Sequence, residues 1–270
     1  MSRALLYALL ALLGLYLAVG LILRALQERL LFPAPVVARA DLAHMAQLAG
    51  ATELAVPSEG ETLYGWHRPA GGTHAVLYFH GNASYTAVNV LPMRIAKQAG
   101  WDFICISPRG YPGSTGQPAP GFLRADAQAA WAYATTVLGF APGNIVLHGR
   151  SLGGGMVGEL MDSVEPGGLI IESSFRSMAA LVQEKIFAWP MGLILQYPLR
   201  TTDRAAAVSA PVLVLHGDAD EMIPVAHGRG LAAAFPAAEY VEVPGKGHND
   251  GLLQDPAVAA AVRAWLDARR

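Results

Sequence analysis

One short run constrains the fold of this chain most: Gly149-Arg150-Ser151-Leu152-Gly153. It follows a strand-like apolar run, residues 144–148, and opens a helix-like run, residues 152–161. Between a strand and a helix, a G-x-S-x-G pattern predicts a sharp turn that projects the serine at the strand end. Flanking glycines suit such a strained turn because they let strand and helix approach closely. Ser151 is therefore a candidate nucleophile, although a glycine-rich turn with a capping serine fits the pentapeptide equally well.

Strand-like and helix-like segments alternate from about residue 51 onward, which predicts a mostly parallel central sheet flanked by helices. The expected strands are short apolar runs bounded by turn signals, at residues 63–67, 75–79, 103–106, 145–147, 169–171, 212–215 and 240–243. Helices are expected between them, including residues 122–137, 152–161, 225–235 and 256–269. In such sheets the site lies beyond the carboxyl ends of the strands, so partners of Ser151 should follow other strands.

The N-terminal segment carries 20 consecutive uncharged residues, 4–23, which is long enough to cross a bilayer as one helix. A cleaved signal peptide is the main alternative. The length of the run and the absence of a nearby Ala-x-Ala favour an uncleaved, single-pass anchor. The flanking arginines are nearly balanced and favour neither membrane orientation. The expected organisation is an anchor (1–24), a juxtamembrane connector (25–50) and a catalytic domain (51–270) with a cap insertion at about 174–209.

Composition excludes some classes of function. The 270 residues suit one α/β domain besides the anchor, and the net charge of -2, without a long basic run, argues against nucleic acid as a partner. The single cysteine, Cys105, lies in an apolar run and is expected to be a buried core residue. No His, Cys or carboxylate cluster has metal-ligand spacing, so neither a metal nor an organic cofactor is expected.

A serine nucleophile needs a base, and the base needs an acid to hold its tautomer. Of eight histidines, His248 alone follows the last expected strand, in the glycine-flanked loop 244–250. The others are interpreted as structural, surface or packing residues, His80, His148 and His216 because they sit at strand ends.

Candidate acids follow two expected strands. Asp218 and Asp220 both lie on the loop after residues 212–215, and either could approach the histidine. Asp220 is preferred, with Asp218 bracing the turn. Glu172 is a third candidate, and Asp250 is expected to cap the following helix. The chain order Ser, Asp, His is the order of α/β-hydrolases.

The chain resembles the α/β-hydrolase superfamily, in particular membrane-anchored alpha/beta hydrolase domain-containing proteins with a serine aminopeptidase-like domain. The resemblance extends from Gln27 to the C-terminus and rests on residues 27–33, 80–83, 108–114, 149–153, 216–224 and 247–250. It implies an α/β-hydrolase fold with Ser151 as nucleophile, His248 as base and Asp220 as acid, and so selects Asp220 over Asp218.

An oxyanion hole completes the expected site. Its natural donors are the backbone N–H of Leu152, directly after the nucleophile, and that of Asn82 in the loop after an earlier strand. Gly81 allows this loop to pass close to the serine. An ordinary strand-to-helix turn is the alternative interpretation of the loop.

The expected reaction is hydrolysis of an ester or thioester through an acyl-enzyme. The insertion at 174–209 is rich in apolar residues and is interpreted as a cap that lines an acyl pocket or as a helix packed on the sheet. Together with the anchor, the cap favours a lipid-like acyl substrate. The alternatives are a serine peptidase of the same fold and a noncatalytic binding protein. A dehalogenase or epoxide hydrolase is disfavoured because the elbow carries serine instead of aspartate.

Overall fold

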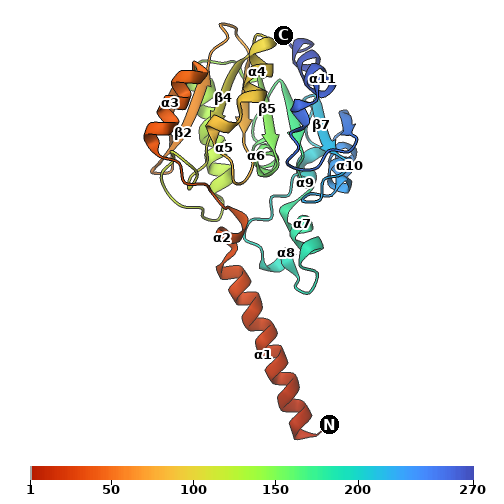
Figure 1. Cartoon of the computed structure of the whole chain (residues 1–270). Coiled ribbons are helices and arrows are strands. Elements are labelled where there is room, and N and C mark those ends of the chain that lie inside the picture. Colours follow the sequence, from red (N-terminus) through yellow and green to blue (C-terminus); the bar gives the residue numbers. More distant parts are fainter. Residues whose placement is uncertain (1) are drawn as a thin grey trace.

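A central sheet of eight strands organises the protein, and helix α1 extends away from the domain built around it (Figure 1). The computed structural model describes residues 2–270. The strand order is β1-β2-β4-β3-β5-β6-β7-β8. The pairs β1–β2 and β2–β4 are antiparallel, and all other pairs are parallel. This is the predicted α/β-hydrolase fold with a mostly parallel sheet.

All seven expected strands are present. They are β2 (Glu61–Arg68), β3 (Ala75–Phe79), β4 (Asp102–Ile106), β5 (Ile145–Arg150), β6 (Gly168–Glu172), β7 (Val212–Gly217) and β8 (Ala238–Val243). Strands β3, β4 and β6 are buried at every position, which explains their continuous apolar sequences. Strand β1 (Thr52–Ser58) was not predicted. It is an edge strand with alternating burial and Pro57 near its end, so its sequence lacks the apolar run of a central strand.

Two hydrophobic cores cover the two faces of the sheet. Alternate side chains of β3 belong to different cores: Leu77 and Phe79 lie in one, and Val76 and Tyr78 lie in the other. The first core includes side chains of α5 (Phe122–Ala132), α6 (Leu152–Leu160) and α10 (Val225–Ala234). The second includes those of α4 (Val90–Gln98) and α11 (Pro256–Asp267). Cys105 lies in this second core and is fully buried, as expected.

The N-terminal segment forms three helices, α1 (Arg3–Ala25), α2 (Gln27–Leu31) and α3 (Arg39–Ala49). Helix α1 is long and apolar enough to cross a membrane, with a mean hydropathy of 2.5 over its best window and 6% of that window buried. Signal sequences also pass this test of length and composition. Helix α3 lies within the stretch expected as a connector, yet its Leu42 and Ala46 are buried in a cluster with Tyr64 and Trp66 of β2.

The insertion between β6 and β7 contains three short helices, α7 (Met178–Lys185), α8 (Met191–Ile194) and α9 (Thr202–Ala205). Met191, Leu195 and Tyr197 are buried in the first core, whereas Phe187 and Leu193 are exposed. Helix α8 lies at the end of the domain from which α1 extends (Figure 1). The insertion therefore packs on the domain by one side and meets the N-terminal helix by another.

Candidate active site

The elbow after β5 holds Ser151 in a strained conformation. Its backbone has φ 53° and ψ −117°, which a non-glycine residue adopts only when the surroundings enforce it. A Cβ on Gly149 would lie 2.3 Å from the carbonyl oxygen of Gly153, and one on Gly153 would lie 1.9 Å from that of Phe79. Both glycines are therefore required: Gly149 by the close approach of β5 and α6, as the sequence predicted, and Gly153 by the approach of α6 to β3, which it did not indicate.

Besides the turn bond from the Gly154 N–H to its carbonyl, two hydrogen bonds from outside the elbow fix the backbone of Ser151. Its N–H donates to the carbonyl of Glu172 at 2.9 Å, and its own carbonyl accepts from the hydroxyl of Ser174 at 2.8 Å. Both partners come from the end of β6 and the residues that follow it, so the neighbouring strand holds the elbow in register.

His248 reaches Ser151 from the loop after β8. Its Nε2 lies 3.1 Å from Ser151 Oγ, and its Nδ1 lies 2.7 Å from Asp220 Oδ2. The guanidinium of Arg150 donates to the carbonyl of His248 at 2.6 Å and ties this loop to the elbow. The structure thus brings together three residues that are 97 and 28 positions apart along the chain.

Asp220 is almost completely buried, and its second carboxylate oxygen is held by the backbone. Oδ1 accepts from the N–H groups of Met222 at 3.0 Å and Ile223 at 2.7 Å. Burial alone would raise the pKa of Asp220, but hydrogen bonds from His216, His248 and the Ile223 N–H outweigh it and lower the pKa below its ordinary value. Asp220 is therefore ionised at neutral pH and faces Nδ1 of the histidine.

The other carboxylates considered from the sequence lie elsewhere. Asp218 Oδ1 accepts from the N–H of Gly245 at 2.6 Å, so it braces the loop that carries the histidine and not only its own turn. Glu172 is paired with His148 at 3.1 Å and approaches Arg150 Nε at 3.5 Å, so it is engaged in a buried ion pair beneath the elbow.

The role predicted for Asp250 is wrong. Its Oδ2 accepts from the N–H of Gly247 at 2.8 Å, within the histidine loop. The cap of α11 is Asp255, whose side chain accepts from the N–H groups of Ala257 and Val258. Pro256 places the first helical turn directly after Asp255, which is the signal that identifies the capping residue.

The loop after β3 passes directly beside the elbow. A Cβ on Gly81 would lie 3.2 Å from Ser151 Cβ, so this loop has little room for a side chain here. Asn82 follows on the loop, and Leu152 begins α6, where the first N–H groups have no partner within the helix. The two residues expected to form an oxyanion hole thus flank Ser151 from two different elements.

The side chain of Asn82 is held by groups that the sequence did not indicate. Its amide donates to the carbonyl of Leu31 at 2.6 Å, and its Oδ1 accepts from the hydroxyl of Tyr111. The next residue, Ala83, has a φ of 50° and donates its N–H to the carbonyl of Pro33 at 3.0 Å. The last residue of α2 and the backbone just after it therefore fix this loop. Motifs at strand ends can be found from the sequence. A hydrogen bond from a side chain to a backbone carbonyl 51 positions away cannot.

Within residues 2–270, no three His, Cys, Asp or Glu side chains gather in a way that could hold a metal ion.

Comparison with known proteins identifies relatives across most of the chain. An uncharacterized protein of Mycobacterium tuberculosis is 32% identical over 246 residues, which cover 89% of this chain and 87% of that protein. Alpha/beta hydrolase domain-containing protein WAV2 of Arabidopsis thaliana is 31% identical over 220 residues, 73% of this chain and 71% of that protein. A protein-family model described as TAP-like protein matches residues 182–269.

Solved structures agree on the fold. An esterase of Pyrococcus furiosus superimposes with a TM-score of 0.71 at 14% identity, over 88% of this chain and 96% of that one. The fold, the elbow and the curated relatives lead to one conclusion: the chain belongs to the α/β-hydrolase superfamily.

Proposed function

We propose that the protein is a serine hydrolase that cleaves an ester or thioester through an acyl-enzyme. One observation carries this proposal: an unbroken chain of short contacts from Ser151 Oγ to His248 Nε2 and from His248 Nδ1 to Asp220 Oδ2. A serine in a strained elbow, a buried histidine and an ionised aspartate are the components that nucleophilic acyl transfer requires.

In the proposed cycle, Ser151 Oγ attacks the acyl carbon while His248 Nε2 takes the hydroxyl proton. Asp220 stabilises the imidazolium that forms, without itself taking the proton. The N–H groups of Leu152 and Asn82 donate to the oxyanion, a contribution of about 3 kcal/mol for one such donor. The imidazolium then protonates the leaving alcohol or thiol, and a water molecule, deprotonated by the same histidine, hydrolyses the acyl-enzyme.

A fluorophosphonate probe tests the nucleophile. The full-length protein should be labelled, and Ser151→Ala and His248→Ala should not. Ser163→Ala is the matched control, because it removes a hydroxyl beyond the far end of α6, where the group donates to the carbonyl of Leu160. Equal labelling of Ser151→Ala and the native protein would show that another residue reacts and would contradict the proposal.

We also propose that α1 is a retained single-pass anchor and that the substrate is lipid-like. Contacts between α1 and the insertion support retention, since cleavage would break the bonds from Tyr16 OH to the Ala188 carbonyl and from Arg24 to the Ile194 carbonyl. The bond from Asn82 to the Leu31 carbonyl supports a lipid-like substrate. It joins the loop beside the elbow to the segment that follows the proposed anchor, so the edge of the sheet that carries the elbow (hereafter the elbow edge) would lie near the membrane.

Two measurements test these proposals separately. The intact mass of the protein from membranes should include residues 1–24; loss of that segment would identify a signal peptide. A series of p-nitrophenyl esters should show rising kcat/KM with acyl length, and a preference for acetyl over all longer chains would contradict a lipid-like substrate.

A further inference from the structure

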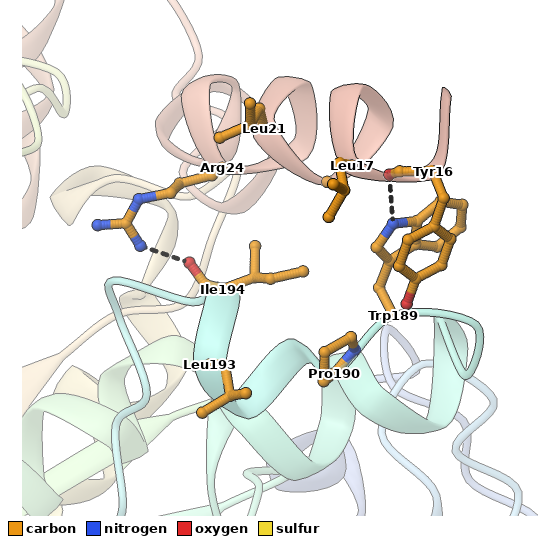
Figure 2. A pocket seen from close by; sticks show the side chains of 9 residues that line it. Tyr16, Leu17, Leu21, Arg24, Trp189, Pro190, Leu193 and Ile194 are labelled. Atoms are coloured by element: carbon orange, nitrogen blue, oxygen red, sulfur yellow. Dashed lines mark hydrogen bonds between the residues drawn. The ribbon is translucent and has the colours of Figure 1, made fainter. Parts of the chain in front are cut away.

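Helix α1 does not stand free of the domain along its whole length. Tyr16 and Trp189 stack with ring centroids 5.0 Å apart and planes 6° from parallel, and Trp189 Nε1 donates to the Tyr16 carbonyl at 3.2 Å (Figure 2). Gly20 allows the close approach, because a Cβ there would lie 3.3 Å from Trp189 Cδ1. Arg24 donates to the Ile194 carbonyl at 2.9 Å. The segment 187–194, hereafter the cap tip, therefore lies beside the second half of α1.

If α1 spans a bilayer, its length determines whether the cap tip beside it can remain in water. A helix rises about 1.5 Å per residue, so residues 4–23 span about 30 Å, the thickness of a bilayer hydrocarbon core. The cap tip covers α1 from Tyr16 to Arg24, about 12 Å of its length. Residues 4–15 alone span about 18 Å, too short to cross. If α1 crosses the bilayer, the cap tip lies in the same apolar layer.

The chemistry of the cap tip fits that layer. Residues 186–195 contain no charged side chain. Phe187 is 86% exposed and Leu193 is 83% exposed, and Leu17 and Leu21 of α1 are also exposed. Leu193 lies with Leu17 and Leu21 on an apolar surface shared by the cap tip and α1.

Two backbone carbonyls of the cap tip have hydrogen-bond donors within the protein. Irregular backbone at membrane depth must find partners within the protein. The Ala188 carbonyl accepts from the Tyr16 hydroxyl at 2.8 Å, and the Ile194 carbonyl accepts from Arg24 and, at 3.0 Å, from Gln27 Nε2. At position 190 proline has no N–H to satisfy. Side chains of α1 and α2 therefore donate hydrogen bonds to carbonyls for which lipid chains offer no donor.

A pocket of about 530 Å³ lies between α1 and the cap tip. Leu17, Leu21 and Leu193 line it, with Tyr16 and Trp189 at one end and Arg24 toward the other (Figure 2). Ser151 is not among its lining residues, so it is distinct from the candidate active site. Because it opens between a membrane-spanning helix and an apolar tip, the molecules available to fill it are bilayer lipids.

We propose that the cap tip is immersed in the bilayer beside α1 and that this pocket holds an acyl chain of a membrane phospholipid. The inference rests on the proposed membrane anchor. It adds a second lipid-contacting element, which fixes the domain against the membrane surface at two points instead of leaving it on a single tether. The elbow edge of the sheet is thereby held toward the lipid.

Site-specific labels in vesicles test the immersion. The natural cysteine, Cys105, is fully buried, so an introduced cysteine is the site that reacts under native conditions. Leu193→Cys reports on the cap tip, Leu10→Cys on α1, and Val137→Cys on an exposed position before β5, at the opposite edge of the sheet from the elbow. Each full-length variant carries an environment-sensitive fluorophore in phosphatidylcholine vesicles with brominated acyl chains.

The label at Leu193 should be quenched to an extent comparable with that at Leu10, and the label at Val137 should not be quenched. Quenching at Leu10 without quenching at Leu193 would overturn the inference and leave the anchor intact, the result expected if a second copy of the chain covered the tip. Absence of quenching at both positions would overturn the anchor as well.

The fluorescence of Trp189 tests occupancy of the pocket. Subtracting the emission of Trp189→Phe from that of the native protein isolates this residue among the five tryptophans. Its emission should fall strongly when brominated phospholipid replaces the plain lipid. An equal Trp189 emission in the two lipids would show that no acyl chain enters the pocket.

Discussion

Gly153→Ala is the sharpest test of why the elbow has its sequence. A Cβ at this position would lie 1.9 Å from the carbonyl oxygen of Phe79, 2.6 Å from its carbonyl carbon and 3.0 Å from the carbonyl oxygen of His80. All three are backbone atoms at the end of β3, so no side-chain rotation can relieve the clash. Since real Cβ contacts shorter than 3.0 Å are essentially absent, α6 or β3 must move by about 1 Å.

The expected steric strain is about 3 kcal/mol, at the upper end of the range for overpacking, because both displaced elements are buried backbone. Helix propensity offsets about 1 kcal/mol of the strain, since alanine replaces glycine. A shift of about 1 Å in the serine or in the first N–H of α6 should also reduce kcat about 100-fold in the protein that remains folded.

Thermal unfolding in detergent micelles, followed by circular dichroism, and kcat for a p-nitrophenyl ester measure the two effects. Gly155→Ala is the matched control, because it makes the same change two residues further along α6, where the atoms nearest to the new Cβ are the side-chain ends of Phe175 and Leu199 at 3.1 Å. The control should retain stability and activity. If Gly153→Ala has the same unfolding temperature and the same kcat as the native protein, the steric explanation of the elbow is refuted.

Three further predictions concern the groups around the serine. Asp220→Asn should lower kcat about 10,000-fold, because the amide cannot hold His248 in the required tautomer or stabilise its charged form; a loss below tenfold would contradict the proposed acid. His80 is buried, which lowers its pKa to about 4, so the unfolded chain binds more protons between pH 6.5 and pH 4. This residue should therefore cost about 3 kcal/mol of stability as the pH falls through that window, and His80→Gln should flatten the pH dependence of urea unfolding. Tyr111→Phe removes the hydroxyl that donates to Asn82 Oδ1 and should lower kcat with little change in KM, since the loop acts on the transition state; an unchanged kcat would show that this bond does not position the loop.

The sequence predicted seven of the eight strands and, with Asp220 selected over Asp218 by the family resemblance, the three candidate catalytic residues. Strands buried on both faces need continuous apolar runs, and a tight elbow needs small residues on either side of the serine, so both leave local patterns. The loop positions of Asp220 and His248 follow from chain order, because the carboxyl ends of parallel strands meet at one edge. The edge strand β1 and the helix α3 escaped prediction since their half-exposed, mixed sequences resemble those of a connector.

Only the tertiary structure decided how the N-terminal segment is joined to the rest of the molecule. Asn82 bonds to the carbonyl of Leu31, and Tyr16 stacks on Trp189 across 173 positions of the chain. Such contacts use backbone carbonyls and single aromatic rings, which occur throughout the chain and carry no pattern of their own. Their partners are selected by the path of the whole chain. Local sequence therefore indicates which residues are candidates for catalysis, and the packed fold determines what holds them in place.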